Sequence, residues 1–397
     1  MTSTKKIKIV NLGDVVNFEG GGTPSKANSE YWGGDIPWAS VKDVSGPELS
    51  STVDYITEEG LANSASRMVP AGNVILPTRM ALGRAAINTI DVAINQDLRV
   101  AYPNQSLDRR YLLWFIISNA RLIESLGSGA TVKGITLDKL RDLQIPLPLL
   151  AEQKRIAAIL DKADVIRRKL QQSLRLSDDF LRSVFLDMFG DPVTHPKGWP
   201  VVPLSEGVEF FDGGKNVNPI DTDRRDGMRV LKVSAVTSGE YREAESKSFG
   251  EDFNIPADYI VKSGDLLISR ANTAELVGAV AYVWNTTGRA MLPDKLWRFV
   301  WSKPAKINPL FMLHLGRSEH FRKQLILRAT GSSGSMKNIG KVKMLEIPIP
   351  LPPIALQNKF AAIVNKTQGK IQKSTAFLQD AESLFSSLQQ RAFRGEL

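Results

Sequence analysis

The sequence contains no cysteine, so both a disulfide framework and a thiolate metal site are excluded. Its three histidines, His195, His314 and His320, lack the His-Glu-x-x-His spacing, which argues against a structural zinc site. The longest strongly apolar stretch, Leu112 to Ile117, is far shorter than the roughly 20 residues that span a bilayer. The segment from Met1 to Lys8 lacks the apolar core of a signal peptide, and a cytoplasmic location is therefore expected.

The composition is that of a globular protein with an excess of positive charge. The chain has 397 residues, which suggests two to three domains, because single hydrophobic cores rarely grow beyond about 250 to 300 residues. There are 51 Lys and Arg residues against 42 Asp and Glu residues, which gives a net charge of +9. This excess favours a polyanionic partner such as nucleic acid, although many basic proteins are simply basic.

One stretch of sequence occurs twice. Residues Ile145 to Leu160 align without a gap with Ile349 to Val364, at an offset of about 204 residues, and both copies begin Ile-Pro-Leu-Pro. The match continues upstream, where Ile135 corresponds to Ile339, and downstream, where Phe189 corresponds to Phe393. The chain is therefore a tandem duplication, and two equivalent surfaces are a more natural product of it than one enclosed catalytic pocket.

Each repeat consists of a globular segment followed by one long helix. Residues 7–110 and 199–310 alternate short β-rich runs with Gly, Pro, Asn and Asp turns, which indicates loop-rich α+β units. Helical patterns follow at 111–126 and 309–328. The Pro-Leu-Pro elements then hold the chain extended, because proline disfavours the α conformation of the residue before it. Long helices are predicted from there to about residues 189 and 393.

Apolar residues recur along both long helices at steps of three and four, as in a coiled-coil seam. Burying roughly ten such side chains at about 1.5 to 3 kcal/mol each favours antiparallel pairing of the helices. The alternative is that each helix packs on its own globular segment. The residues predicted to pair the helices or to dock a partner are Ile156, Ile159, Ile166, Leu170, Leu174, Leu181, Phe360, Ile363, Ile371, Leu378, Phe385 and Leu388.

Several short patterns resemble enzyme motifs, and each is incomplete. Phe18 to Gly22 has the form of an S-adenosylmethionine loop but leads into Thr23-Pro24 rather than a helix. Asn308 to Phe311 lacks the middle proline of an amino-methyltransferase motif, and Gly213 to Asn216 lacks the Ser or Thr of a phosphate loop. Turns are the better interpretation, so the chain is expected to bind no cofactor and no metal itself.

Polar and aromatic clusters occur in both globular segments. Arg and Lys suit guanine and Asn and Gln suit adenine in the major groove, while other contacts go to phosphates. For any single residue, a solvated surface role is the alternative. The residues predicted to contact DNA are Trp38, Lys42, Arg79, Arg84, Asn95, Gln96, Lys133, Lys215, Asn216, Arg224, Arg225, Lys232, Arg270, Asn272, Lys295, Arg298 and Lys337.

The order of these elements resembles the specificity subunit of type I restriction-modification enzymes over essentially the whole chain. The residues that carry the resemblance are Ile145–Pro148, Glu152–Ile156, Phe185–Pro192 and Arg391–Leu397, with Asn95–Leu98 and Gly127–Leu140. The second repeat departs from this pattern at Leu356 and Asn358, where an acidic and a basic residue are expected.

The resemblance implies an α+β fold in which two tandem target-recognition domains, each mixed and β-rich, are separated by two long helices. These helices would pair as an antiparallel coiled coil with pseudo-two-fold symmetry. The expected parts are target-recognition domain 1 at 1–142, a central helical spacer at 143–195, target-recognition domain 2 at 196–346 and a C-terminal helical spacer at 347–397.

The resemblance also implies a non-catalytic subunit that reads an asymmetric, bipartite site in double-stranded DNA, one domain per half-site. Its helices would dock two modification (methyltransferase) subunits, and restriction (motor) subunits would join them. S-adenosylmethionine, ATP and Mg are expected on those partners. The alternatives are a self-contained DNA methyltransferase or nuclease and a coiled-coil scaffold without DNA specificity.

Overall fold

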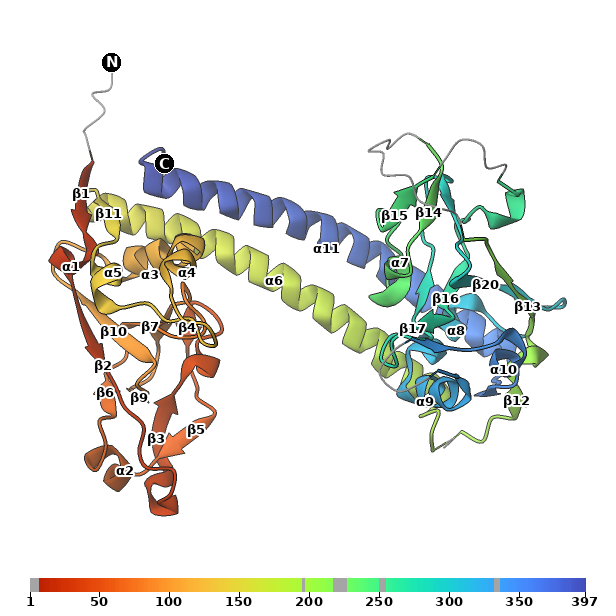
Figure 1. The fold of residues 1–397 in the computed structure, drawn as a ribbon, viewed down its shortest axis with the longest axis horizontal. Coiled ribbons are helices and arrows are strands. Elements are labelled where there is room, and N and C mark those ends of the chain that lie inside the picture. Colours follow the sequence, from red (N-terminus) through yellow and green to blue (C-terminus); the bar gives the residue numbers. More distant parts are fainter. Residues whose placement is uncertain (1–6, 195–196, 217–226, 250–254, 332–335) are drawn as a thin grey trace. The chain divides into compact units, whose positions relative to one another are not determined.

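The computed structural model describes residues 7–194, 197–216, 227–249, 255–331 and 336–397. It divides into two compact units. Unit 1 contains the chain up to Gln172 together with Thr375–Leu397, and unit 2 contains Ser173–Ser374 (Figure 1). Each long helix therefore contributes one part to each unit. The domain boundaries expected from the sequence instead cut the chain into four consecutive segments. Those boundaries stay a prediction.

Two sheets form the globular part of unit 1. In the described residues one has the strand order β2-β10-β7-β8-β4 and the other the order β5-β3-β9-β6. The strands are β2 (Val16–Gly20), β3 (Trp32–Ala39), β4 (Glu48–Leu49), β5 (Asp54–Ile56), β6 (Arg67–Val69), β7 (Val74–Pro77), β8 (Ala86–Asn88), β9 (Val92–Ile94) and β10 (Leu98–Pro103). Val74 and Leu76 pack into one apolar core and Ile75 into another, as expected for a strand covered on both faces.

Short helices and 3₁₀ turns connect the strands of unit 1. They are α1 (Leu12–Val15), α2 (Glu58–Ala62), α3 (Arg109–Ser118), α4 (Ala120–Leu126) and α5 (Leu137–Arg141), with 3₁₀ turns η1 (Ser29–Tyr31) and η2 (Val41–Asp43). The helix predicted at 111–126 is broken at Asn119, whose side-chain amide donates to the carbonyl of Phe115. Strand β1 (Lys8–Asn11) pairs antiparallel with β11 (Gln144–Leu147), which is the extended Pro-Leu-Pro element.

Unit 2 repeats this plan with smaller sheets. Within its described residues the strand orders are β13-β20-β16-β18, β15-β14-β19, β12-β22 and β17-β21. The strands are β12 (Val201–Pro203), β13 (Val208–Gly213), β14 (Arg229–Leu231), β15 (Ser246–Ser248), β16 (Leu266–Ser269), β17 (Ala271–Asn272), β18 (Val280–Tyr282), β19 (Ala290–Met291), β20 (Leu296–Trp301), β21 (Lys337–Asn338) and β22 (Pro348–Pro350).

The helices of unit 2 also match those of unit 1. They are α7 (Ser234–Thr237), α8 (Pro309–Arg317), α9 (Glu319–Arg328) and α10 (Lys341–Leu345), with 3₁₀ turns η3 (Leu204–Glu206) and η4 (Ala257–Tyr259). The helix predicted at 309–328 is interrupted at Ser318. Its hydroxyl accepts from the backbone N–H of Phe321 at 3.2 Å and so caps α9.

The two long helices, α6 (Leu150–Phe189) and α11 (Ile354–Arg394), confirm the predicted pair. In unit 1, Gln171 donates to Glu382 at 3.3 Å, and one turn earlier on α6 the Arg167 guanidinium lies 5.0 Å from the Phe385 ring centre. Since later positions on α6 meet earlier positions on α11, the helices run antiparallel there. In unit 2, Phe185 on α6 contacts Phe360 near the start of α11.

The repeat places one buried glutamine in each unit, and its side chain bonds to three backbone groups. Gln153 accepts from the N–H of Asp108 at 2.8 Å and donates to the carbonyls of Ser106 and Pro148, each at 2.9 Å. Gln357 makes the same set of bonds in unit 2, with Asn308, Lys306 and Pro352. Both side chains are fully buried, so these bonds fix the start of each long helix to its globular segment.

Candidate nucleic-acid interface

Three loops of unit 1 meet beyond the end of strand β7. The N–H of Thr78 donates to the carbonyl of Asp97 at 2.8 Å, and the N–H of Ile135 donates to the carbonyl of Thr78 at 2.9 Å. Two residues after Thr78, the N–H of Met80 donates to the carbonyl of Lys133 at 2.9 Å. These backbone bonds hold the segments 78–84, 95–97 and 127–135 together.

Unit 2 has the same backbone arrangement. The N–H of Arg270 donates to the carbonyl of Lys295, and the N–H of Ile339 donates to the carbonyl of Arg270, each at 3.0 Å. Asn272 then pairs with Lys337 across β17 and β21. By these bonds Thr78 corresponds to Arg270, Asp97 to Lys295 and Met80 to Asn272. We call the two loop groups reading loops 1 (78–84, 95–97, 127–135) and reading loops 2 (270–273, 294–295, 336–339).

Reading loops 1 carry exposed polar and cationic side chains. Arg79 is 63% exposed, and its guanidinium lies 3.6 Å from the carboxylate of Asp97. Arg84, Gln96 and Lys133 are also exposed, and the Gln96 amide oxygen accepts a hydrogen bond from Thr23. These four predicted residues are therefore brought together on one loop group, where cations could hold phosphates.

Reading loops 2 hold their arginine more firmly. The Arg270 guanidinium donates to the carbonyl of Asp294 at 2.7 Å and to the amide oxygen of Asn338 at 3.1 Å, and it lies 5.6 Å from the Trp297 ring centre. Asn272, Lys295 and Lys337 are half-buried beside it. The Lys337 ammonium donates to the carbonyl of Gly331 at 3.0 Å. This unit thus combines the predicted residues on a more tightly bonded surface.

Three of the predicted DNA contacts are wrong, because the protein itself encloses them. Trp38 is 5% exposed, and its indole N–H donates to the carbonyl of Gly22 and the hydroxyl of Ser66. Asn95 is also 5% exposed, and its amide oxygen accepts from the N–H of Asp97. The Arg298 side chain is 11% exposed and is held by Asp212 and Asp265.

Two carboxylates keep the mostly buried Arg298 side chain charged. Burial disfavours its charged form, but the hydrogen bond to Asp212 and the charge of Asp265 outweigh this and raise the pKa of Arg298. The distances to these two carboxylates are 2.7 and 3.1 Å. The Arg298 guanidinium on β20 is thus bonded to β13 and to η4 of the protein itself, and a ligand would have to compete with these partners. Sequence alone could not separate it from the exposed arginines, since all share one residue type.

The other predicted contacts are scattered. Lys42 forms an ion pair with Asp54 at 2.8 Å, and this hydrogen bond raises the pKa of Lys42. Lys232 lies 3.9 Å from Glu245, whereas Lys215 and Asn216 are exposed after the end of β13. Arg224 and Arg225 lie outside the described residues. All of these stay predictions.

Sequence reasoning missed Met80. In the described part of the chain it is the non-glycine residue with a positive φ, at 67°, and it is 57% exposed. An L-residue pays about 1 to 2 kcal/mol for this left-handed conformation. The sequence offers no signal for it, because the segment that holds this loop is distant in the chain: Met80 bonds to Lys133 and Arg79 pairs with Gly134.

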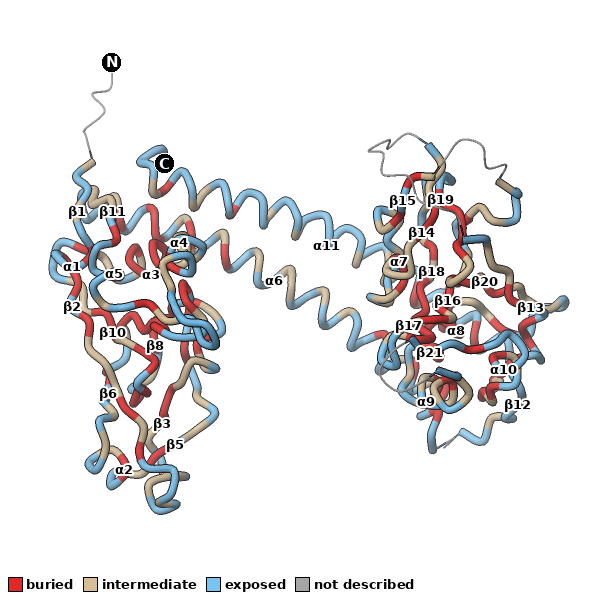
Figure 2. The backbone as a smooth tube through the Cα atoms, viewed as in Figure 1, coloured by how far each residue is buried: buried red, intermediate tan, exposed pale blue. Residues whose placement is uncertain are grey.

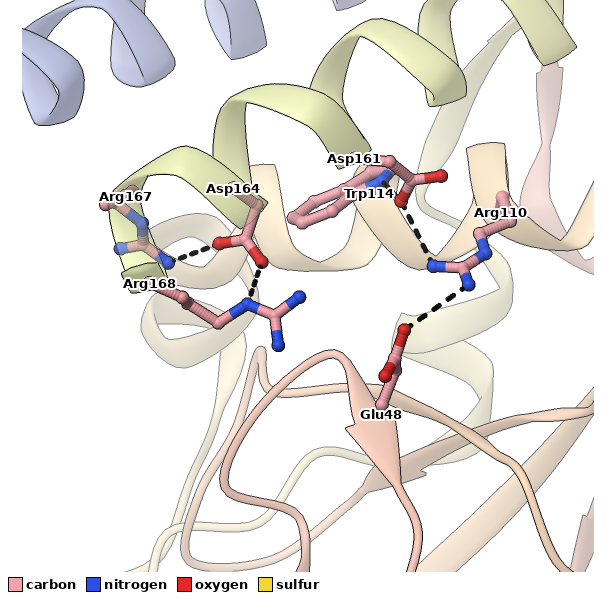
Figure 3. A network of polar contacts seen from close by, with 7 residues as sticks. All are labelled: Glu48, Arg110, Trp114, Asp161, Asp164, Arg167 and Arg168. Carbon is pink, nitrogen blue, oxygen red and sulfur yellow. Dashed lines mark hydrogen bonds and ion pairs between the residues drawn. The ribbon is translucent and has the colours of Figure 1, made fainter. Parts of the chain in front are cut away.

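Polar contacts join α6 to α3 of unit 1 (Figure 3). Asp161 accepts from Arg110 at 3.1 Å and from the indole N–H of Trp114 at 2.9 Å. Asp164 is 1% exposed and accepts from both Arg167 and Arg168 at 2.7 Å. Asp161 therefore ties α6 to α3, whereas the two ion pairs of Asp164 lie within α6 itself.

The predicted helix seam is buried at its ends and open in its middle (Figure 2). Ile156, Leu181, Phe360 and Phe385 are buried. Partly buried are Ile159, Leu170, Leu174, Ile363, Ile371, Leu378 and Leu388. Ile166 is 56% exposed, so it does not pack in the helix seam, and Asp164 is the buried residue on that turn; docking of a partner by Ile166 stays a prediction. Partner docking by these residues stays a prediction.

Within the described ranges, no group of three or more His, Cys, Asp or Glu side chains is placed to hold a metal ion. In the same ranges no helix is long and apolar enough to cross a membrane. His314 stacks on Phe185 and meets the Phe360 ring edge to face, and burial lowers the pKa of His314 to about 3. It is therefore a neutral core residue of unit 2 near pH 7.

Comparison with known proteins relates both the sequence and the fold to one family. Residues 4–175 match the family model described as type I restriction modification DNA specificity domain. The EcoR124I/EcoR124II specificity subunit of Escherichia coli is 33% identical over 170 residues, which cover 41% of this chain and 42% of that protein. The MjaVIII specificity subunit of Methanocaldococcus jannaschii is 22% identical over 375 residues, covering 89% and 84%.

The first two curated relatives are matched over 42% and 52% of their length, so the chain spans about half of each. The crystal structure of a type I restriction-modification S subunit from M. genitalium shares the fold, with a TM-score of 0.65 at 14% identity over 99% of this chain and 98% of that one. In sequence this chain is thus similar to type I restriction-modification specificity subunits, with the family model matched over residues 4–175, and in fold it is similar to a solved S subunit.

Proposed function

We propose that this chain is the DNA-reading subunit of a type I restriction-modification complex. Each unit would recognise one half of an asymmetric, bipartite site in double-stranded DNA, and the chain itself would catalyse no reaction. The observation that carries this proposal is the pair of reading loops: the same backbone bonds recur in both units, but they present different side chains.

The contrast between the loops is chemical. Where unit 1 has Thr78 and Met80, unit 2 has Arg270 and Asn272. Arginine suits guanine and asparagine suits adenine, whereas methionine offers only apolar surface. Two readers on a shared backbone with unlike side chains are suited to two unlike half-sites. The net charge of +9 favours the phosphate contacts that both would need.

We further propose that α6 and α11 dock two modification subunits. Exposed apolar side chains lie at repeat-equivalent positions: Leu150 and Ile354 are 39% and 37% exposed, and Phe180 and Leu384 are 50% and 58% exposed. Large apolar side chains in water are typical of interaction surfaces when they gather on one element. Equivalent positions in both repeats favour two copies of one partner. The partner subunits, and not this chain, would bind S-adenosylmethionine, ATP and Mg. Any restriction subunits would join the modification subunits.

The direct test is methylome sequencing of host cells with and without the gene for this chain. We expect one split, asymmetric motif to lose methylation when the gene is deleted. If no motif disappears, the proposed function fails. A purified chain that methylates or cleaves DNA alone would favour a self-contained enzyme. DNA affinity without a steep decrease at higher salt would favour a scaffold that makes no phosphate contacts.

Matched heptad insertions test whether the helices set the gap between half-sites. Seven residues inserted after Gln172 in α6 and after Ser374 in α11 preserve the contacts within each unit. They lengthen each helix by about 10 Å, which equals about three base pairs of B-DNA. We expect the nonspecific gap of the methylated motif to widen by about three base pairs while both half-site sequences stay the same. An unchanged gap would reject the spacer role.

A further inference from the structure

Reading loops 1 contain an apolar side chain in a place that neither folding nor solubility explains. Met80 is 57% exposed, so it contributes little to the core of unit 1. Its φ of 67° is one that glycine or asparagine adopts at lower cost. A strained, exposed methionine points to a role for the side chain itself.

The loop holds Met80 in this conformation from both sides. Its N–H donates to the carbonyl of Lys133 at 2.9 Å, and the preceding residue, Arg79, bridges to Gly134. After it, the N–H of Ala81 donates to the carbonyl of Arg79 at 2.9 Å. The side chain therefore leaves the loop from a fixed backbone position, as a side chain that discriminates between bases must.

Exposed cations lie on the same loop group as this apolar side chain. Arg79 is 63% exposed, and both Arg84 and Lys133 are exposed on the same reading loops. Cations that bind phosphates would bring Met80 to the edge of the base pairs. In the major groove the apolar group presented by a base pair is the 5-methyl of thymine.

The equivalent position of unit 2 carries the opposite chemistry. Asn272 pairs with Lys337 as Met80 bonds to Lys133, and its side-chain oxygen accepts from the N–H of Thr273 at 2.8 Å. This bond orients an amide that could read adenine. Hence one backbone position holds an apolar reader in unit 1 and an amide reader in unit 2.

We propose that Met80 is a specificity-determining residue that contacts the 5-methyl group of one thymine in the half-site read by unit 1. The inference rests on the proposed function, since it requires that unit 1 bind duplex DNA. Asn272 is the corresponding residue for the other half-site. Thymine recognition by Met80 distinguishes one T·A pair and leaves the rest of the motif to other side chains.

The test replaces the wild-type gene in its host with variants and sequences the methylome. In Met80→Ala, discrimination at one T·A position of the first half-site should decrease by up to the cost of one mismatched base pair, about 5- to 150-fold, with the second half-site unchanged. Met80→Leu should retain that preference. Met68→Ala is the matched control, because Met68 lies on β6 and is 37% exposed, away from the reading loops.

Met80→Gly separates recognition from folding. Glycine relieves the positive φ, so thermal stability should be unchanged or higher while the T·A preference is lost. An unchanged motif in both Met80→Ala and Met80→Gly would overturn the inference and leave the proposed function standing. Uniformly weaker methylation with the same motif would also overturn it, because an inserted wedge would act on all sequences. If wild type yields no split motif, the proposed function fails first.

Discussion

Replacing Gln153 with leucine should lower the free energy of unfolding by about 3 kcal/mol or more. Leucine cannot replace the amide, so the N–H of Asp108 and the carbonyls of Ser106 and Pro148 would lose their partner. Each buried polar group without a hydrogen bond costs about 1 to 3 kcal/mol. The temperature of the first unfolding transition should fall by roughly 6 to 12 °C, measurable by calorimetry of the purified chain.

Gln172→Leu is the control for this change. It makes the same substitution on the same helix, but Gln172 is exposed. We expect its effect to stay within about 0.5 kcal/mol, as for surface substitutions generally. Equal stability of the Gln153→Leu variant and the wild type would mean that the glutamine does not hold α6 to its globular segment.

Replacing Phe385 with alanine should have a similarly large effect, about 3 to 5 kcal/mol. The ring is 6% exposed, its centre lies 5.5 Å from that of Trp114, and the Arg167 guanidinium lies 5.0 Å from it. Its removal opens a cavity at the place where α11 packs on α3. Loss of amide protection in the last turns of α11, followed by hydrogen exchange, should accompany the lower stability.

Phe377→Ala provides the comparison on the same helix. Phe377 is 61% exposed, so its truncation leaves no cavity, and stability should change by less than about 0.5 kcal/mol. If Phe377 belongs to the docking surface instead, this variant should weaken binding of the modification subunit without unfolding the chain. A stable Phe385→Ala variant would contradict the packing of α11 on unit 1.

Much of the fold follows from local chemistry in the sequence. The bounds of α6 and α11 agree closely with the predicted helices because prolines end the preceding strands and the apolar positions follow helical spacing. The repeat marks Gln153 and Gln357 as equivalent, and both are buried. By contrast, the helix breaks at Asn119 and Ser318 were not predicted, since they depend on capping bonds within apolar runs.

The candidate site divides in the same way. The sequence alone determined that basic and amide residues gather in both repeats, because residue type and charge need no coordinates. Only the tertiary structure decided that Trp38, Asn95 and Arg298 are enclosed while Arg79 is exposed. The positive φ of Met80 also arises from contacts with residues distant in the chain. Burial and backbone strain depend on tertiary contacts between segments that are distant in the chain, and local sequence patterns do not encode those contacts.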